Sequence, residues 1–270
     1  ILATVLGYGD IDAAVSPAPS CGIGESGYAR IASGDTVVIA DCAGPPPLEL
    51  AASAGAGCLS FELCSGTSMI LSNGGLPGSG HSDWTAAARS TASHNTLVLG
   101  EASSSRLITD SRLTTLLGAP PIRGPARVTA NTFEHDNGEV GFEASHDGYL
   151  ERHGVLHQRT LTIERGGRRI VGIDRLKPPR GTMRLKRDVP FSIHFHLHPG
   201  VTCRRADAVG TVAIEARGQR WQLVAEGARV VIEESAHYAD AGGPLATLQV
   251  VLRGATFGES EVRWALTRLE

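Results

Sequence analysis

Histidines at three places in the chain have the spacing to support chemistry. The first is His94, followed by Asn95, where a loop enters an apolar run that ends at Leu99. A histidine at the start of a strand can act as a general base, can ligate a metal ion, or can simply cap a turn. The residue types alone leave all three interpretations open.

The second place is a run of alternating histidines, His194, His196 and His198. On a strand these side chains share one face. Two histidines separated by one residue can hold a zinc ion through neutral ring nitrogens, although a third ligand would have to come from another strand. The alternative is a polar sheet face whose rings hydrogen-bond to their neighbours, and this alternative is favoured over zinc.

The third place is a Gly-rich loop over residues 73–81 that leads into His81 and Trp84. An exposed tryptophan beside a histidine could stack on a sugar ring. A tryptophan that closes the core under the loop is the favoured alternative. Further on, the segment His146-Asp147-Gly148-Tyr149 is typical of a turn.

The elements that must position these residues are strands. Hydrophobic alternation with a period of two dominates the chain after residue 20, and turn residues such as Ser33-Gly34-Asp35 separate the runs. Many short strands with little helical periodicity predict an all-β fold, with two large antiparallel sheets packed face to face as a sandwich. The predicted strands cover residues 28–32, 36–41, 57–64, 68–72, 95–99, 127–132, 139–145, 155–164, 169–176, 191–197, 211–216, 219–225, 228–233, 245–253 and 262–269.

The segment Gly22–Gly27 matches the pattern G-x-G-x-x-G. A dinucleotide site needs a strand before this pattern and a helix after it. Here a proline-containing stretch precedes it and a strand follows, so we interpret it as a loop. Residues 1–22 are interpreted as a linker or as the tail of a preceding helical domain, and residues 23–270 as one β-sandwich domain.

Composition limits the partners. A net charge of −3 does not favour nucleic-acid binding, which needs a concentrated basic surface. No apolar run approaches the roughly 20 residues of a membrane helix, so no membrane partner is expected. The five cysteines have no regular spacing and are interpreted as buried thiols. The oligomeric state stays open, with a homodimer among the assemblies compatible with the sequence.

Several blocks together resemble the carboxy-terminal β-domain of the heparinase II/III family of polysaccharide lyases. They are Cys58–Leu63, Arg89–Leu99, Glu143–Tyr149 and Phe195–Val201, within a resemblance that runs from Tyr28 to Pro199. The resemblance implies an amino-terminal α/α toroid followed by this β-sandwich. It also implies β-elimination on uronic-acid polysaccharides, with a toroid tyrosine as proton donor and a sandwich histidine and structural zinc near the cleft.

By that resemblance, a His-x-His pair should precede the Leu59–Leu63 strand, and an acidic residue should follow the next strand. This chain has Ser53 and Gly55 at the first two positions and Ser72 or Asn73 at the third. Only His94 matches, so the family metal pattern is incomplete and no zinc site is assigned there.

The resemblance predicts His94 as the catalytic residue and places Arg89, Asn95, His81 and Trp84 as substrate contacts. Two hypotheses follow. In the first, the chain is the carboxy-terminal domain of a lyase that acts on an acidic polysaccharide, and it is inactive without its toroid. In the second, it is a non-catalytic glycan-binding or structural module. Characterised family members are periplasmic, but no compartment is assigned to this chain.

Overall fold

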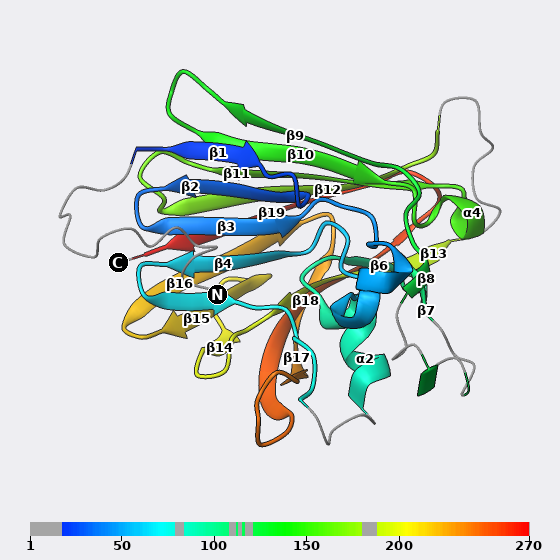
Figure 1. Cartoon of the computed structure of the whole chain (residues 1–270). Coiled ribbons are helices and arrows are strands. Elements are labelled where there is room, and N and C mark those ends of the chain that lie inside the picture. Colours follow the sequence, from blue (N-terminus) through cyan, green and yellow to red (C-terminus); the bar gives the residue numbers. More distant parts are fainter. Residues whose placement is uncertain are drawn as a thin grey trace.

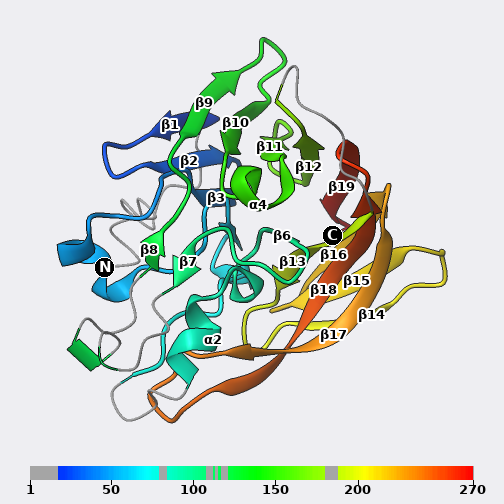
Figure 2. The same cartoon turned by 90° about the vertical axis from the view of Figure 1, so that its right-hand side faces the viewer.

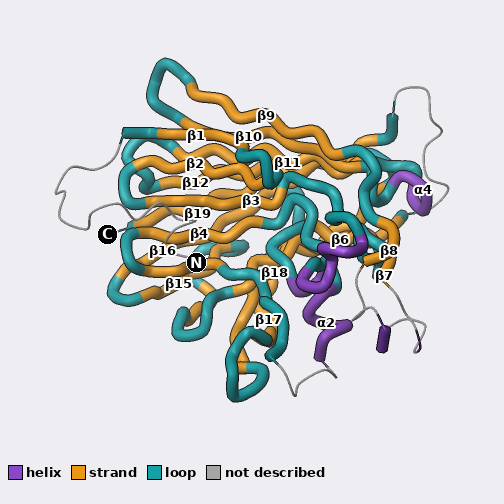
Figure 3. The backbone as a smooth tube through the Cα atoms, viewed as in Figure 1, coloured by secondary structure: helices purple, strands orange, loops and turns teal. Residues whose placement is uncertain are grey.

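The computed structural model describes residues 18–78, 84–107, 112, 115–116, 121–179 and 188–269 (Figure 1). Antiparallel strands dominate these residues, and the short helices gather at one end of the strands (Figure 3). The all-β fold predicted from the hydrophobic alternation is therefore confirmed. No helix in this part of the chain has the length and apolar character needed to cross a membrane.

The strands form three larger sheets and one small pair. The five-stranded sheet has the order β1-β2-β3-β4-β5, the eight-stranded sheet the order β14-β15-β16-β19-β12-β11-β10-β9, and the four-stranded sheet the order β17-β18-β13-β6. The first contains β1 (Ser20–Ile23), β2 (Tyr28–Ser33), β3 (Thr36–Asp41), β4 (Phe61–Ser65) and β5 (Ser68–Leu71).

The other elements complete the framework. The eight-stranded sheet contains β9 (Val128–Glu134), β10 (Val140–His146), β11 (Leu156–Ile163), β12 (Arg169–Lys177), β14 (Thr202–Arg205), β15 (Thr211–Ala216), β16 (Gln219–Glu226) and β19 (Ser260–Arg268). The four-stranded sheet contains β6 (Leu97–Leu99), β13 (Val189–His196), β17 (Arg229–His237) and β18 (Leu245–Thr256). The remainder are the β7 (Arg106–Leu107) and β8 (Pro121–Arg123) pair, the 3-10 helices η1 (Leu48–Ser53) and η3 (Thr91–Ser93), and the helices α2 (Thr85–Arg89) and α4 (Leu150–His153).

One hydrophobic core lies between the sheets. β1 and β2 pack beside β9 and β10 (Figures 1 and 2), and alternate residues of these strands point into a shared apolar cluster. The five- and four-stranded sheets meet at a bridge between Leu71 and Leu197. The backbone N–H of Ser72 donates to the carbonyl of His196 beside this bridge. The two smaller sheets therefore act as one bent layer opposite the eight-stranded sheet.

The structure differs from the sequence prediction at the amino-terminal side. Ser20 pairs with Ala32, so β1 belongs to the sheet, although residues up to 22 were interpreted as a linker. The Gly-rich pattern forms the turn between β1 and β2, where Gly27 has a φ of +80°. A strand follows it rather than a helix, as expected. Residues 1–17 and His81 lie outside the described residues.

Candidate functional site

A cavity of about 570 Å³ opens beside the end of β3, where the chain leaves the sheet towards η1. Its wall combines residues of β2, β3 and β4 with the loops around residues 43–46, 53–58 and 73–76. His94 closes one side. These segments are distant in sequence, and the antiparallel pairing of β2, β3 and β4 is what brings them together.

Three polar side chains reach the cavity from the outward face of the five-stranded sheet. Tyr28 is the register partner of Asp41, and Glu62 is the partner of Ile39, two residues before Asp41. Because side chains alternate across a strand, Ile39 and Asp41 share a face, and the paired positions on β2 and β4 lie on it too. All four residues line the cavity.

Both carboxylates in this cavity are held in an unfavourable environment. Burial raises the pKa of Asp41 to about 6, although the N–H of Ala43 donates to Oδ1 at 3.1 Å and opposes the shift. Burial likewise raises the pKa of Glu62, which accepts one bond from the N–H of Asn73 at 3.1 Å. Desolvation, and then the charges of Asp41 and Glu62, raise the pKa of the Tyr28 hydroxyl. This wall is therefore acidic and poorly neutralised.

His94 is neutral and has a defined tautomer. Its Nδ1 lies 2.7 Å from the carbonyl oxygen of Ser90, which can only accept, so Nδ1 carries the proton. Nε2 then holds a lone pair, and burial lowers the pKa of the ring. A group with this tautomer at a cavity wall can accept a hydrogen bond or a proton.

Two glycines shape the space around the His94 ring. A Cβ added to Gly55 would lie 2.8 Å from Nε2, and one added to Gly57 would lie 2.6 Å from Cδ2. Real Cβ atoms do not approach that closely, so the ring occupies the volume that a side chain at residue 55 would need. The position at which the family resemblance implies a histidine is therefore filled by the His94 ring itself.

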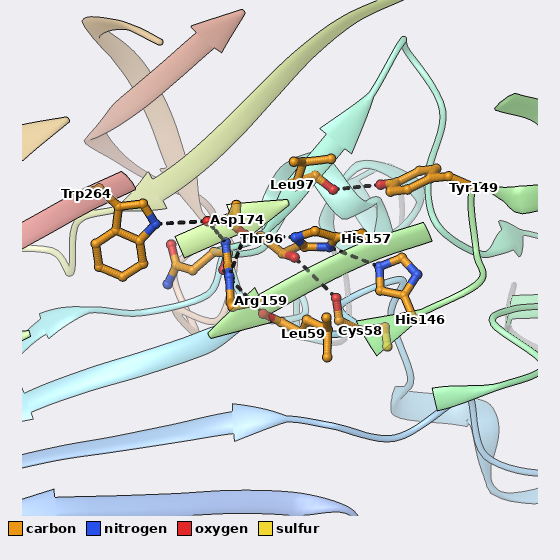
Figure 4. Close-up of polar contacts among 11 residues, drawn as sticks. Cys58, Leu59, Thr96, Leu97, His146, Tyr149, His157, Arg159, Asp174 and Trp264 are labelled. Atoms are coloured by element: carbon orange, nitrogen blue, oxygen red, sulfur yellow. Dashed lines mark hydrogen bonds and ion pairs between the residues drawn. The ribbon is translucent and has the colours of Figure 1, made fainter. Parts of the chain in front are cut away.

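A second polar cluster lies in the core behind this site (Figure 4). Arg159 Nε donates to Asp174 Oδ1 at 2.8 Å, and Trp264 Nε1 donates to Asp174 Oδ2 at 2.9 Å. His157 Nε2 lies 2.8 Å from Asp174 Oδ1, and His157 Nδ1 lies 3.2 Å from His146 Nε2. We call these five residues the buried network.

The proton positions in the buried network follow from its partners. The N–H of Gly148 donates to His146 Nδ1 at 3.0 Å, so the His146 proton is on Nε2 and is donated to His157. His157 then donates from Nε2 to Asp174. Burial lowers the pKa of both histidines, whereas Arg159 and His157 more than offset the burial of Asp174 and hold its pKa well below its usual range.

The buried network fixes the segments that carry the candidate site. Arg159 Nη1 donates to the carbonyl oxygens of Leu59 and Asn95, each at 2.7 Å. Leu59 has a φ of +61°, which costs energy for a residue other than glycine. The guanidinium therefore holds both the strained turn before β4 and the turn after His94.

Asn95, which was predicted as a substrate contact, lies in the interior of the domain. It is fully buried, its Nδ2 donates to the Phe61 carbonyl at 2.9 Å, and its Oδ1 accepts from the N–H of His196 at 2.6 Å. Arg89 is also buried, at the end of α2, and is not part of the cavity wall. These two residues support the site from behind.

Trp84 does not close the core, which was the favoured interpretation of its sequence context. Its side chain is 48% exposed, and its ring lies 6.2 Å from that of Tyr238. The N–H of Tyr238 donates to the carbonyl of Gly74, which lies in the loop that lines the cavity. Half-exposed Trp84 and partly buried Tyr238 thus form an aromatic pair that is tied to that loop.

The alternating histidines of β13 are satisfied by protein partners. His194 contacts Gln249 and Ser192, and His196 contacts Ser235 and the Ala92 carbonyl, all at 2.8 to 2.9 Å. His198 lies past the strand end, 6.2 Å from the His237 ring. Among the described residues, no group of three or more His, Cys, Asp or Glu side chains is arranged to hold a metal ion.

The acidic residues of the cavity were missed at the sequence level. Glutamates and aspartates are scattered along the chain, and only the register of β3 against β4 brings Asp41 and Glu62 to one face. The sequence did indicate that Asp41 shares the outward face of β3 with Val37 and Ile39, because side chains alternate along the strand. The pairing of Arg159 with Asp174 could not be predicted from the sequence, because the two residues lie on different strands.

Comparison with known proteins agrees with the predicted resemblance. Residues 16–265 match the family model described as heparinase II/III-like, C-terminal. The FtsZ-localized protein C of Caulobacter vibrioides is 31% identical over 254 residues, which are 91% of this chain and 43% of that protein.

Among solved structures, heparan sulfate lyase HepC from Pedobacter heparinus matches with a TM-score of 0.69 and 16% identity, over 98% of this chain and 38% of that one. A structure of heparinase III matches with a TM-score of 0.66 and 13% identity, over 93% of this chain and 37% of that one. This likeness shows the shared fold. The chain spans less than half of each relative. It belongs to the heparinase II/III-like C-terminal domain family.

Proposed function

We propose that this chain is a saccharide-binding domain of a heparinase II/III-like protein and that its cavity binds sugar without β-elimination. The observation that carries the proposal is the packing of His94 against Gly55 and Gly57. With that packing, the described lining of the cavity holds one histidine where the family resemblance implies a set of metal-binding and catalytic groups.

The charge of the cavity supports the same proposal. β-Elimination beside a uronate pushes electron density into its carboxylate, so a lyase site stabilises the transition state with positive charge. The described residues that line this cavity include Asp41 and Glu62 but neither lysine nor arginine. A uronate placed here would meet like charge, and its carbanion would be destabilised.

Binding to a panel of oligosaccharides tests the proposal. The purified chain is titrated calorimetrically with neutral, amino-sugar and uronate oligosaccharides, and with the same sugars after His94→Ala. We expect saturable binding of at least one class, weakened in the variant. A chain that binds none of them, while remaining folded by circular dichroism, would leave only a structural role.

A lyase is the second candidate, and one observation favours it: Nε2 of His94 carries a lone pair at the cavity wall. In this alternative the full-length protein supplies an α/α toroid with a proton-donating tyrosine and acts on an acidic polysaccharide. The test is the ultraviolet absorbance of newly formed unsaturated uronate ends. Absorbance from the full-length protein that disappears in His94→Ala would replace the binding proposal.

The identity to FtsZ-localized protein C suggests where such a protein acts. We propose that the protein carrying this domain localises with FtsZ, as the name of its relative states for that protein. Co-imaging of a fluorescent fusion with FtsZ in dividing cells tests this independently of sugar binding. A diffuse signal throughout division would contradict it.

A further inference from the structure

We propose that the cavity selects saccharides that carry a free, positively charged amino group, such as an unsubstituted hexosamine, with Asp41 and Glu62 as the groups that receive it. This inference rests on the proposed saccharide-binding function and names the ligand class for the same cavity. It differs from the uronate expected from the family resemblance.

The first argument is the balance of charge at the wall. Asp41 and Glu62 are the acidic groups among the described lining residues, and no cation there opposes them. Arg30 lies on the same face of β2, but its Nη1 donates to Ser20 Oγ at 3.2 Å, and it is not part of the wall. A ligand that brings a positive charge would therefore supply the missing counter-charge.

The second argument is unused hydrogen-bonding capacity. Each cavity carboxylate accepts one backbone N–H from the described residues, whereas an ionised carboxylate can accept about four hydrogen bonds. On the surface Glu261 receives Arg175 Nε at 2.6 Å and Arg263 Nε at 2.7 Å. Within the described part of the chain, no arginine or lysine donates to the cavity carboxylates in this way. An ammonium group, with three donors, matches this deficit.

The third argument comes from the neighbours of the two carboxylates. His94 is partly buried at the wall, and its Nε2 has no hydrogen-bond donor among the described residues, so it can accept a bond from a sugar hydroxyl. Tyr28 is 50% exposed and also lines the cavity, and an aromatic ring offers a face for a cation or for the apolar side of a sugar.

The size of the cavity favours an organic cation over a metal ion. Its volume of about 570 Å³ lies within the range typical of small-molecule sites. Its acidic and imidazole groups are not grouped closely enough to share one ion, as the described residues contain no metal-holding set. A sugar ring with an amino substituent fits both facts.

Calorimetric titration of the purified chain with three matched tetrasaccharides tests the inference: glucosamine, N-acetylglucosamine and galacturonic acid. Each is measured with wild type, with Asp41→Asn/Glu62→Gln, and with Asp35→Asn/Glu215→Gln as control. The control removes two exposed carboxylates outside the cavity wall and so matches the change in net charge. Thermal melting confirms that each variant is folded.

We expect tightest binding of the glucosamine tetrasaccharide, weakened at least about tenfold in Asp41→Asn/Glu62→Gln and unchanged in the control, because charged hydrogen bonds are lost. Equal binding of the N-acetylated sugar, or preference for the uronate, would overturn the amine selectivity while leaving saccharide binding intact. Binding of none of the three by folded wild type would overturn the inference, and failure across the wider neutral, amino and uronate panel would also overturn the proposed function.

Discussion

The buried network and the cavity contain similar ionisable side chains in opposite circumstances. Asp174 in the core receives bonds from Arg159, His157 and Trp264, and its pKa is lowered. Asp41 at the cavity receives one backbone N–H, and its pKa is raised to about 6. A carboxylate with every partner in place supports the fold, whereas one that lacks partners is available to a ligand.

The largest expected effect comes from breaking the network. Arg159→Met leaves Asp174 as an uncompensated buried charge and frees the carbonyls of Leu59 and Asn95. We expect a loss of about 3–5 kcal/mol in the free energy of unfolding, measured by urea denaturation. Arg169→Met, which breaks an exposed pair with Glu164, should cost at most about 0.5 kcal/mol. Similar losses of stability in Arg159→Met and Arg169→Met would contradict the expected difference between a buried and an exposed ion pair.

The next largest effect is expected from acid, which should destabilise the fold by protonating buried histidines. His196 has a pKa lowered from 6.5 to about 3, so the unfolded chain binds this proton first as the pH falls. Its contribution is fully present above about pH 6.5 and is lost between that pH and about 3. At pH 4.5 the cost from His196 alone is about 3 kcal/mol, and the buried His146 and His157 shift in the same direction. Denaturation curves across this pH range measure it; a flat profile would count against buried neutral histidines.

A side chain at Gly57 tests how tightly the cavity holds His94. Gly57→Ala places its Cβ 2.6 Å from the ring and should cost about 1–3 kcal/mol. Gly22→Ala, where no atom lies within 4 Å, serves as the control. The double variant Gly57→Ala/His94→Ala should lose less than the sum of its single changes, because the clash disappears. Additive losses would show that the ring does not need this space.

Removing the Asp41 charge should increase the free energy of unfolding, whereas removing Arg159 should decrease it. Because the folded pKa is raised from 3.8 to about 6, ionisation of Asp41 opposes folding above about pH 4. Asp41→Asn should therefore stabilise the protein by about 3 kcal/mol at pH 7.5, with the gain largely lost near pH 4. Thermal melting at both pH values measures it. A destabilised variant at pH 7.5 would mean that the carboxylate has a structural partner.

The smallest effect on stability is expected at Trp84. Its exposed ring should be removable, as Trp84→Ala, within about 0.5 kcal/mol of wild type by urea denaturation. If the pair with Tyr238 extends the saccharide site, the same variant weakens sugar binding, while Phe257→Ala, another half-exposed aromatic, leaves it unchanged. Unchanged binding in both variants would limit the site to the cavity.

Periodicity alone predicted most of this fold, because apolar alternation follows from burial of one strand face. It missed β1 and β14, which are four residues long and mostly exposed, and so carry little apolar signal. The sequence predicted both His94 and Asn95 as site residues. In the structure His94 lines the cavity, whereas the Asn95 side chain is buried in the core, and the sequence alone does not show which way each side chain points. Asp41 and Glu62 required the register between strands, which depends on contacts across the sheet.

The position of β19 in the eight-stranded sheet also affects how the protein is made. This strand lies between β16 and β12, yet it follows every other strand of the sheet in the chain. During translation, the β14-β15-β16 half and the β12-β11-β10-β9 half therefore cannot join through β19 until residue 268 has left the ribosome. Until then β16 and β12 each keep an unpaired edge. Open edges pair readily with other strands, so the nascent chain is most exposed to misassembly just before its synthesis reaches this point.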